Sequence, residues 1–116
     1  LTDDMPPNPW MDDVTKGVSK WGTSMNTACQ LAVWLGFTEL FFLGVPGSYT
    51  QEKAHIADYP DQYGPWSEAD DKAHQLTHGK IAQNLNRLGV KAWNCSRETF
   101  IKAYPRMTLE EALCRF

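Results

Sequence analysis

The sequence predicts a small α/β domain built on a Rossmann-like, three-layer parallel sheet. Three observations support this prediction: helical and strand-like apolar patterns alternate along the chain, the first strand-length run is continuously apolar, and glycine or proline separates the elements. Parallel strands need crossover connections, and the alternation supplies helices for them. Because two strands are well marked and a third is short, we expect a small or partial sheet of two to three strands with flanking helices.

Residues 1–20 are predicted to form an extended arm or linker that precedes the Rossmann-like domain at 21–116. The arm contains three prolines and four aspartates, a composition that disfavours helix and buries little apolar surface. Trp10 and Met11 are its candidate anchors. A chain of 116 residues seldom holds two independent cores, so we expect a single domain.

The first helix is predicted to follow the hydroxyl-rich turn at 22–24 and to stop at Gly36. Apolar residues recur at helical spacing up to Leu35 and widen into a nearly complete ring, so we expect a helix buried on several sides. The apolar run at 40–45 predicts a strand that is covered on both faces. The remaining predicted elements are a long loop over 46–66, a helix from the capping box at 67–70 to Leu88, a strand over 90–95, a short third strand over 100–104, and a helix from the capping box at 108–111 to about 115.

Charge and composition exclude several classes of partner. The net charge of −3 gives none of the basic footprint that a phosphate backbone selects for, so no nucleic-acid partner is expected. The apolar runs are far shorter than the roughly 20 residues that cross a bilayer, so no membrane partner is expected either. The three cysteines are odd in number and lack Cys-x-x-Cys spacing, which disfavours a disulfide framework or a zinc knuckle and predicts a cytoplasmic protein.

The candidate ligand site lies where the carboxyl ends of the strands and the amino ends of the helices meet, as parallel α/β sheets bind their ligands there. The turn at 22–24 offers backbone N–H groups and hydroxyls to a phosphate, and the hydroxyls and phenols of the long loop can bind phosphate or stack on a base or sugar. The alternative for the loop is that its aromatics only fasten it to the surface. The candidate binding residues are Gly22, Thr23, Ser24, Ser48, Tyr49, His55 and Tyr59.

His74 and His78 are the candidate catalytic residues. They lie one helical turn apart on one face, and histidine transfers protons at neutral pH. Their spacing is that of a zinc-binding pair, but Gln75 replaces the glutamate of a metalloprotease, so no metal is predicted. The alternative for His78 is a hydrogen-bonded histidine at the core margin. Glycine-rich dinucleotide, Walker and nucleophile-elbow motifs are missing from the sequence, so no cofactor is predicted.

The run from Gly22 to Val45 resembles the nucleotide-sugar-binding region of bacterial sialyltransferases and of the related flagellin-modifying proteins of the motility accessory factor type. In that pattern a small, hydroxyl-rich turn opens a helix, and a Gly-aromatic-x-Glu-aliphatic-aromatic strand follows. Segments at 55–59, 89–96 and 104–113 are similar to later parts of the same proteins. The resemblance therefore covers residues 20 to 113.

The resemblance implies a Rossmann-type glycosyltransferase fold that uses a CMP-activated nonulosonic acid and needs no metal. It implies that Thr23 and Ser24 lie beside the nucleotide, that Tyr49 contacts its phosphate, and that His74 or His78 is the acceptor base. Pro46 stands where the family usually has Asp. The amino-terminal strand and glycine-rich turn of the family precede the matching region, so the chain resembles the carboxyl half of such a fold.

Two functions follow as hypotheses. The first is a glycosyltransferase-like domain that binds a CMP-sugar, whether or not it turns the donor over by itself. The second is a non-catalytic α/β interaction module, because an incomplete sheet exposes edges that another chain can pair with. In either case a homo-oligomer or a separate amino-terminal half is expected to complete the sheet.

Overall fold

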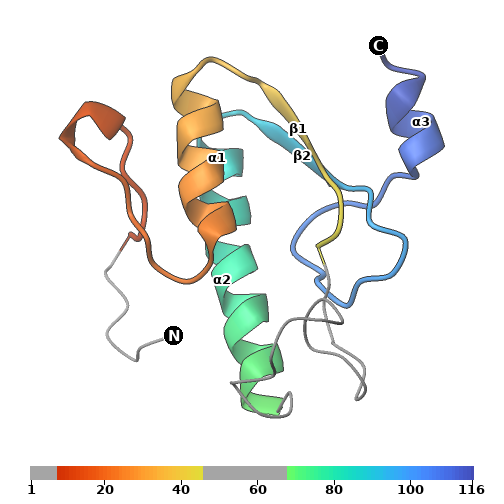
Figure 1. Cartoon of the computed structure of the whole chain (residues 1–116), viewed down its shortest axis with the longest axis horizontal. Helices are drawn as coiled ribbons and strands as arrows, with labels where there is room; N and C mark the ends of the chain where they lie inside the picture. Colours follow the sequence, from red (N-terminus) through yellow and green to blue (C-terminus); the bar gives the residue numbers. More distant parts are fainter. Residues whose placement is uncertain (1–7, 46–67) are drawn as a thin grey trace, which may run out of the picture.

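The computed structural model describes residues 8–45 and 68–116, and they form three α-helices, a 3-10 turn and two strands. The elements are η1 (Val14–Lys16), α1 (Ser24–Trp34), β1 (Glu39–Phe42), α2 (Glu68–Arg87), β2 (Lys91–Asn94) and α3 (Leu109–Leu113) (Figure 1). The prediction of a small α/β fold is confirmed at this level. No helix in these two stretches is long and apolar enough to cross a membrane.

The two strands pair in parallel, and α2 connects them. The register places Glu39 beside Lys91 and Phe42 beside Asn94. The bonds from Lys91 N to Thr38 O and from Cys95 N to Phe42 O continue the ladder beyond both ends of the strands. The strands predicted at 40–45 and 90–95 therefore correspond to β1 and β2. Strand β1 begins one residue before the predicted run and ends three residues before its end.

The two faces of the sheet have different cover. Helices α1 and α2 contact each other on one side of the strands, and α2 also contacts β2 (Figure 1). The other face carries the side chains of Phe41 and Trp93, which meet the last two residues of the chain. The Phe116 ring packs edge-on against Phe41 with centroids 5.5 Å apart, and the Arg115 guanidinium lies 5.4 Å from the Trp93 ring centroid.

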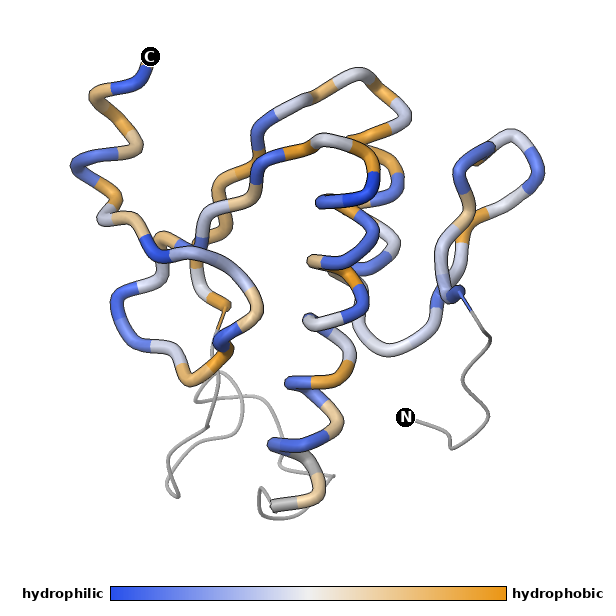
Figure 2. The backbone as a smooth tube through the Cα atoms, turned by 180° about the vertical axis from the view of Figure 1, so that it is seen from behind, coloured by the Kyte–Doolittle hydropathy of each residue, from blue (hydrophilic) through white to orange (hydrophobic). Residues whose placement is uncertain are grey.

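The core lies between the helices and the inner face of the sheet. Its buried members are Trp10, Cys29, Val45, Ile81, Leu85, Val90, Ile101 and Tyr104. Ile81 and Leu85 of α2 are essentially inaccessible to solvent, in agreement with the apolar stripe of that helix. Figure 2 shows a hydrophobic run in β1, whereas β2 and α2 mix hydrophobic and hydrophilic positions.

The expectation that α1 is buried on several sides by apolar residues is wrong. Its buried residues are Asn26, Cys29 and Gln30, while Leu31 and Trp34 are nearly half exposed. The physical reason is that α1 buries a polar stripe against the segment at 8–21, whose backbone groups need hydrogen-bond partners.

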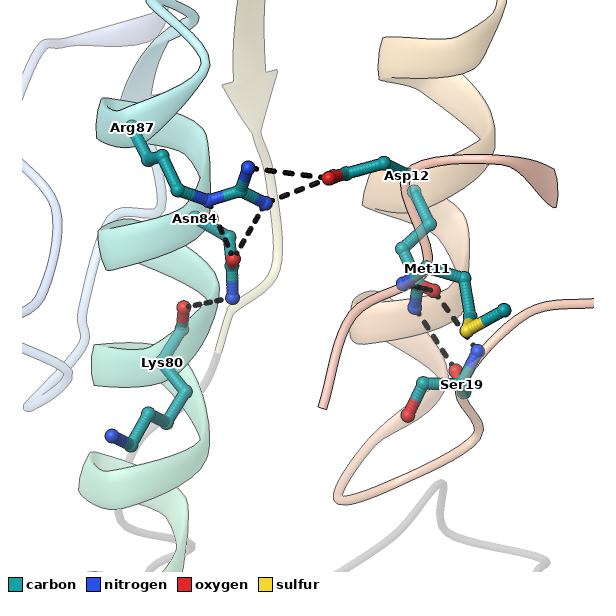
Figure 3. A network of polar contacts seen from close by, with 7 residues as sticks. Met11, Asp12, Ser19, Lys80, Asn84 and Arg87 are labelled. Carbon is teal, nitrogen blue, oxygen red and sulfur yellow. Dashed lines mark hydrogen bonds and ion pairs between the residues drawn. The ribbon is translucent and has the colours of Figure 1, made fainter. Parts of the chain in front are cut away.

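Gln30 fastens this amino-terminal segment to α1. Its Oε1 accepts hydrogen bonds from Met11 N and Ser19 N, both 2.9 Å long, and its Nε2 donates to Ser19 O and Asn26 O. Asn26 in turn donates to Pro9 O. Figure 3 shows Met11 and Ser19 of this segment with their hydrogen bonds, next to an ion pair between Asp12 of the segment and Arg87 of α2.

The short third strand predicted at 100–104 does not form. Side chains take up the backbone groups of this stretch instead: Ile101 N donates to Thr99 Oγ1, and Lys102 N donates to Gln75 Oε1. Pairing with β2 begins only after the proline, where Asn94 and Arg106 form an isolated parallel bridge.

Candidate functional site

The elements that were predicted to meet at one edge of the sheet do meet there. Both strands end on the side from which α1 and α2 start, and the described chain stops at Val45 on this same side (Figure 1). Ser96, just after β2, accepts a 2.7 Å hydrogen bond from Val45 N through its hydroxyl. This bond ties together the two segments that leave the strands.

A cavity of about 900 Å³ lies at the carboxyl ends of the strands. Three segments line it: the exit of β1, the exit of β2, and the start of α3. The lining residues are Leu43, Gly44, Cys95, Ser96, Arg97, Arg106, Met107, Thr108, Leu109, Glu110 and Glu111. Its volume lies in the range of small-molecule sites.

The two arginines of this cavity differ in how they are held. The Arg106 guanidinium donates to Ser96 O and, at 3.4 Å, to Arg97 O, so it also braces the turn after β2. Among the described residues the Arg97 side chain has no such partner, and it is exposed. Arginine offers five donors in a planar fork that fits phosphate oxygens.

The acidic residues of the cavity belong to the start of α3. Thr108 caps this helix by accepting a hydrogen bond from Glu111 N, and its hydroxyl donates to Glu111 Oε1 at 3.0 Å. The N-cap bond of the capping box predicted at 108–111 is therefore confirmed, whereas the Glu111 carboxylate binds the Thr108 hydroxyl instead of the Thr108 backbone N–H. Glu110 and Glu111 add hydrogen-bond acceptors to a cavity whose arginines are donors.

Cys95 is the candidate nucleophile that the cavity contains, and its environment keeps it protonated. Burial raises the pKa of the Cys95 thiol, and the charge of Arg106 only partly opposes this effect. A thiolate, rather than a thiol, is the reactive form of cysteine. The cavity is therefore better suited to binding than to covalent chemistry.

His78 sits in the core rather than at an open site. It is 4 % exposed, and its Nδ1 shares a 2.9 Å hydrogen bond with the Tyr104 hydroxyl. Burial, with a smaller contribution from the charge of His74, lowers the pKa of His78 to about 4. Burial likewise raises the pKa of Tyr104. These contacts match the alternative prediction for His78, which is a hydrogen-bonded histidine at the margin of the core.

His74 lies one turn nearer the start of α2 and is half-buried. Its ring centroid is 6.3 Å from that of His78. The two rings are thus neighbours, as their spacing predicts, but neither lines the cavity at the strand ends. In the described stretches no cluster of three metal-ligating side chains is present.

The turn at 22–24 lies at the start of α1, as predicted, and its role includes packing. Gly22 has a φ of +85° and lies so close to Thr77 of α2 that a Cβ atom would be 2.5 Å from the Thr77 methyl group. Thr23 is the N-cap residue but makes no side-chain capping bond, and its buried hydroxyl has no partner among the described residues. The other four predicted binding residues, Ser48, Tyr49, His55 and Tyr59, lie outside the described residues.

Sequence reasoning missed Arg97, Arg106 and Thr108 as cavity residues. The rule that ligands bind after parallel strands applies equally to the segment after β2, and Ser96 and Arg97 follow that strand directly. The place of Arg97 after the second strand could therefore have been predicted from the sequence. The place of Arg106 could not, because it depends on a bridge between Arg106 and Asn94 that forms after an irregular segment.

Comparisons of this chain with protein-family models, with curated proteins and with solved structures give no match.

Proposed function

We propose that this chain binds a phosphate-bearing small molecule of the nucleotide-sugar class in the cavity at the carboxyl ends of β1 and β2. The observation that carries the proposal is the cavity itself, with Arg97 and Arg106 on the segment around the end of β2. Parallel α/β sheets bind ligands at this edge.

The polarity of the lining suits a CMP-sugar. Arg97 and Arg106 can donate to the phosphate, while Glu110 and Glu111 can accept hydrogen bonds from sugar hydroxyls or from the cytosine amino group. The turn at 22–24 and the start of α2 lie at the same edge of the fold (Figure 1). Binding rather than turnover is proposed, because His78 is a core residue and Cys95 is held as a thiol.

Calorimetric titration tests this proposal with CMP, CMP-sialic acid and inorganic phosphate as separate ligands. Arg97→Gln removes a charge-assisted hydrogen bond and is expected to weaken binding by about tenfold. Lys102→Gln is the matched control, since Lys102 is an exposed cation outside the cavity, and its affinity should equal that of the wild type. No heat at millimolar ligand, or equal affinity in Arg97→Gln and wild type, would refute the proposal.

A second candidate function is sheet completion by another chain. The specific observation is that the described residues form a sheet of two strands, so each strand has an outer edge. The outward-facing backbone groups of Glu39 and Phe41 on the edge of β1, and of Ala92 on the opposite edge at β2, have no partner among the described residues. Such edges are templates for pairing. A strictly monomeric chain in sedimentation equilibrium would remove this candidate.

A further inference from the structure

Among the residues that the structure describes, none pairs with the outer edge of β1, whereas the outer edge of β2 is partly occupied. In the parallel ladder, alternate residues point their backbone groups toward the partner strand, so those of Glu39 and Phe41 point away from β2. At β2 the corresponding groups of Asn94 already bond to Pro105 O and Met107 N. A strand of useful length can therefore add to β1 more readily than to β2.

The segment around β1 is self-complementary when it pairs with itself in the antiparallel direction. If Glu39 of one copy stands opposite Phe41 of a second, the N–H and C=O groups of these two residues, which have no partner among the described residues, pair in four hydrogen bonds. The same register sets Phe37 opposite Leu43. These two side chains are 58 % and 60 % exposed, and the sheet leaves both without cover.

Charge also permits this pairing. Two glutamates near one two-fold axis would repel each other if both were bare. Glu39, however, accepts hydrogen bonds from Trp93 Nε1 and from the Arg115 guanidinium, 2.9 and 2.8 Å long. These contacts lower the pKa of Glu39, and the arginine balances its charge. Each strand edge thus enters the interface nearly neutral.

We propose that two copies of this chain pair through the outer edges of β1 about a two-fold axis, which forms a continuous four-stranded sheet. The inference rests on the second candidate function and names its edge, partner and register. It does not depend on ligand binding. The hydrophobic run at β1 is visible in Figure 2, and an isologous contact of this kind closes on itself instead of propagating.

Cysteine trapping tests the register, with Cys114→Ser as background because Cys114 is the exposed native cysteine. A mixture of Phe37→Cys and Leu43→Cys chains should form an intermolecular disulfide, since the register sets these residues opposite each other just beyond the ends of β1, and Cα atoms of facing antiparallel residues lie about 4.5–5.5 Å apart, within the disulfide range. Each variant alone is the matched control. In a dimer of one variant, the introduced cysteines of the two copies would lie six residues apart along the paired strands, about 20 Å, and should not cross-link.

Sedimentation equilibrium tests the edge independently. The wild type should show a species of twice the 13.2 kDa chain mass at high concentration. Phe37→Lys should weaken the dimer at least tenfold by placing a desolvated charge at the edge. Leu35→Lys is its control, because Leu35 is 72 % exposed and lies outside the paired segment. A monomer at all concentrations, a dimer equally weakened by both lysines, or cross-linking in the single variants alone would each overturn the inference.

Discussion

Protonation of His78 should be a main cause of acid sensitivity in this fold. Its pKa is about 4 in the folded chain and 6.5 in an unfolded one. Below pH 6.5 the unfolded state therefore takes up a proton that the folded state refuses, so the free energy of unfolding falls as the pH is lowered toward 4. At roughly 1.4 kcal/mol for each pKa unit, the loss amounts to about 3 kcal/mol, which is a large share of the stability of a small domain.

Replacing His78 with Gln removes the titrating group and leaves a polar side chain near the Tyr104 hydroxyl. We expect the variant to be less stable than the wild type at pH 7 by about 1 kcal/mol, because its hydrogen bond and packing are imperfect. Between pH 6.5 and 4.5 the wild type should lose about 2 kcal/mol more than the variant, so the two curves should cross within this window and the variant should be the more stable protein at pH 4.5. His74→Gln is the control, since His74 has a smaller effect on the pKa of its neighbour.

Urea unfolding followed by tryptophan fluorescence at half-unit pH steps measures these curves. The difference in slope between wild type and His78→Gln should approach one proton in the window from 6.5 to 4. Parallel curves for the two proteins would show that His78 is not buried in its neutral form, and the core assignment would fail.

Three further changes have expected outcomes that the same unfolding assay can measure. Gly22→Ala should cost more than 2 kcal/mol, because it combines a positive φ with a clash against Thr77, whereas Gly36→Ala, which has a positive φ and open space, should cost about 1 kcal/mol; equal losses would contradict the close approach. Gln30→Met should cost about 2–4 kcal/mol, since it leaves buried backbone groups of the amino-terminal segment without partners; a neutral effect would mean that the segment does not dock. Asp12→Asn should change stability by less than 1 kcal/mol, because its ion pair with Arg87 is exposed on both sides; a larger loss would show that the pair carries the docking instead of Gln30.

Local signals in the sequence predicted the regular elements well. Gly36 and Gly89 end the first two helices with left-handed backbone, as their positions suggested, and Thr108 caps the last helix. These features depend on residues close together in the chain. The paired strands were also predictable, because the apolar run at 40–45 is continuous and of strand length and the run at 90–95 alternates with the strand period.

The burial of individual side chains against residues distant in the sequence was not predictable from the same signals. The apolar ring of α1 suggested burial, but the helix turns Asn26 and Gln30 inward, since the amino-terminal segment supplies backbone groups for them to bind. Likewise His78 and Leu85 share one apolar stripe, and the stripe alone does not reveal that Tyr104 faces the histidine. In both cases the deciding partner lies far away in the sequence.

The cavity of the proposed ligand and the edge of the proposed dimer meet at Leu43, which lines the cavity and also belongs to the segment proposed to pair. If both proposals hold, ligand and second copy compete for, or share, the surface of this side chain, and each must alter the affinity of the other by the same factor. A substitution at Leu43 therefore perturbs two equilibria and cannot separate them. Phe37 and Arg97 each touch one surface only, because Phe37 is remote from the strand exits and Arg97 follows β2. Changing these two residues singly and together distinguishes coupling from independence, since independent sites give additive free energies.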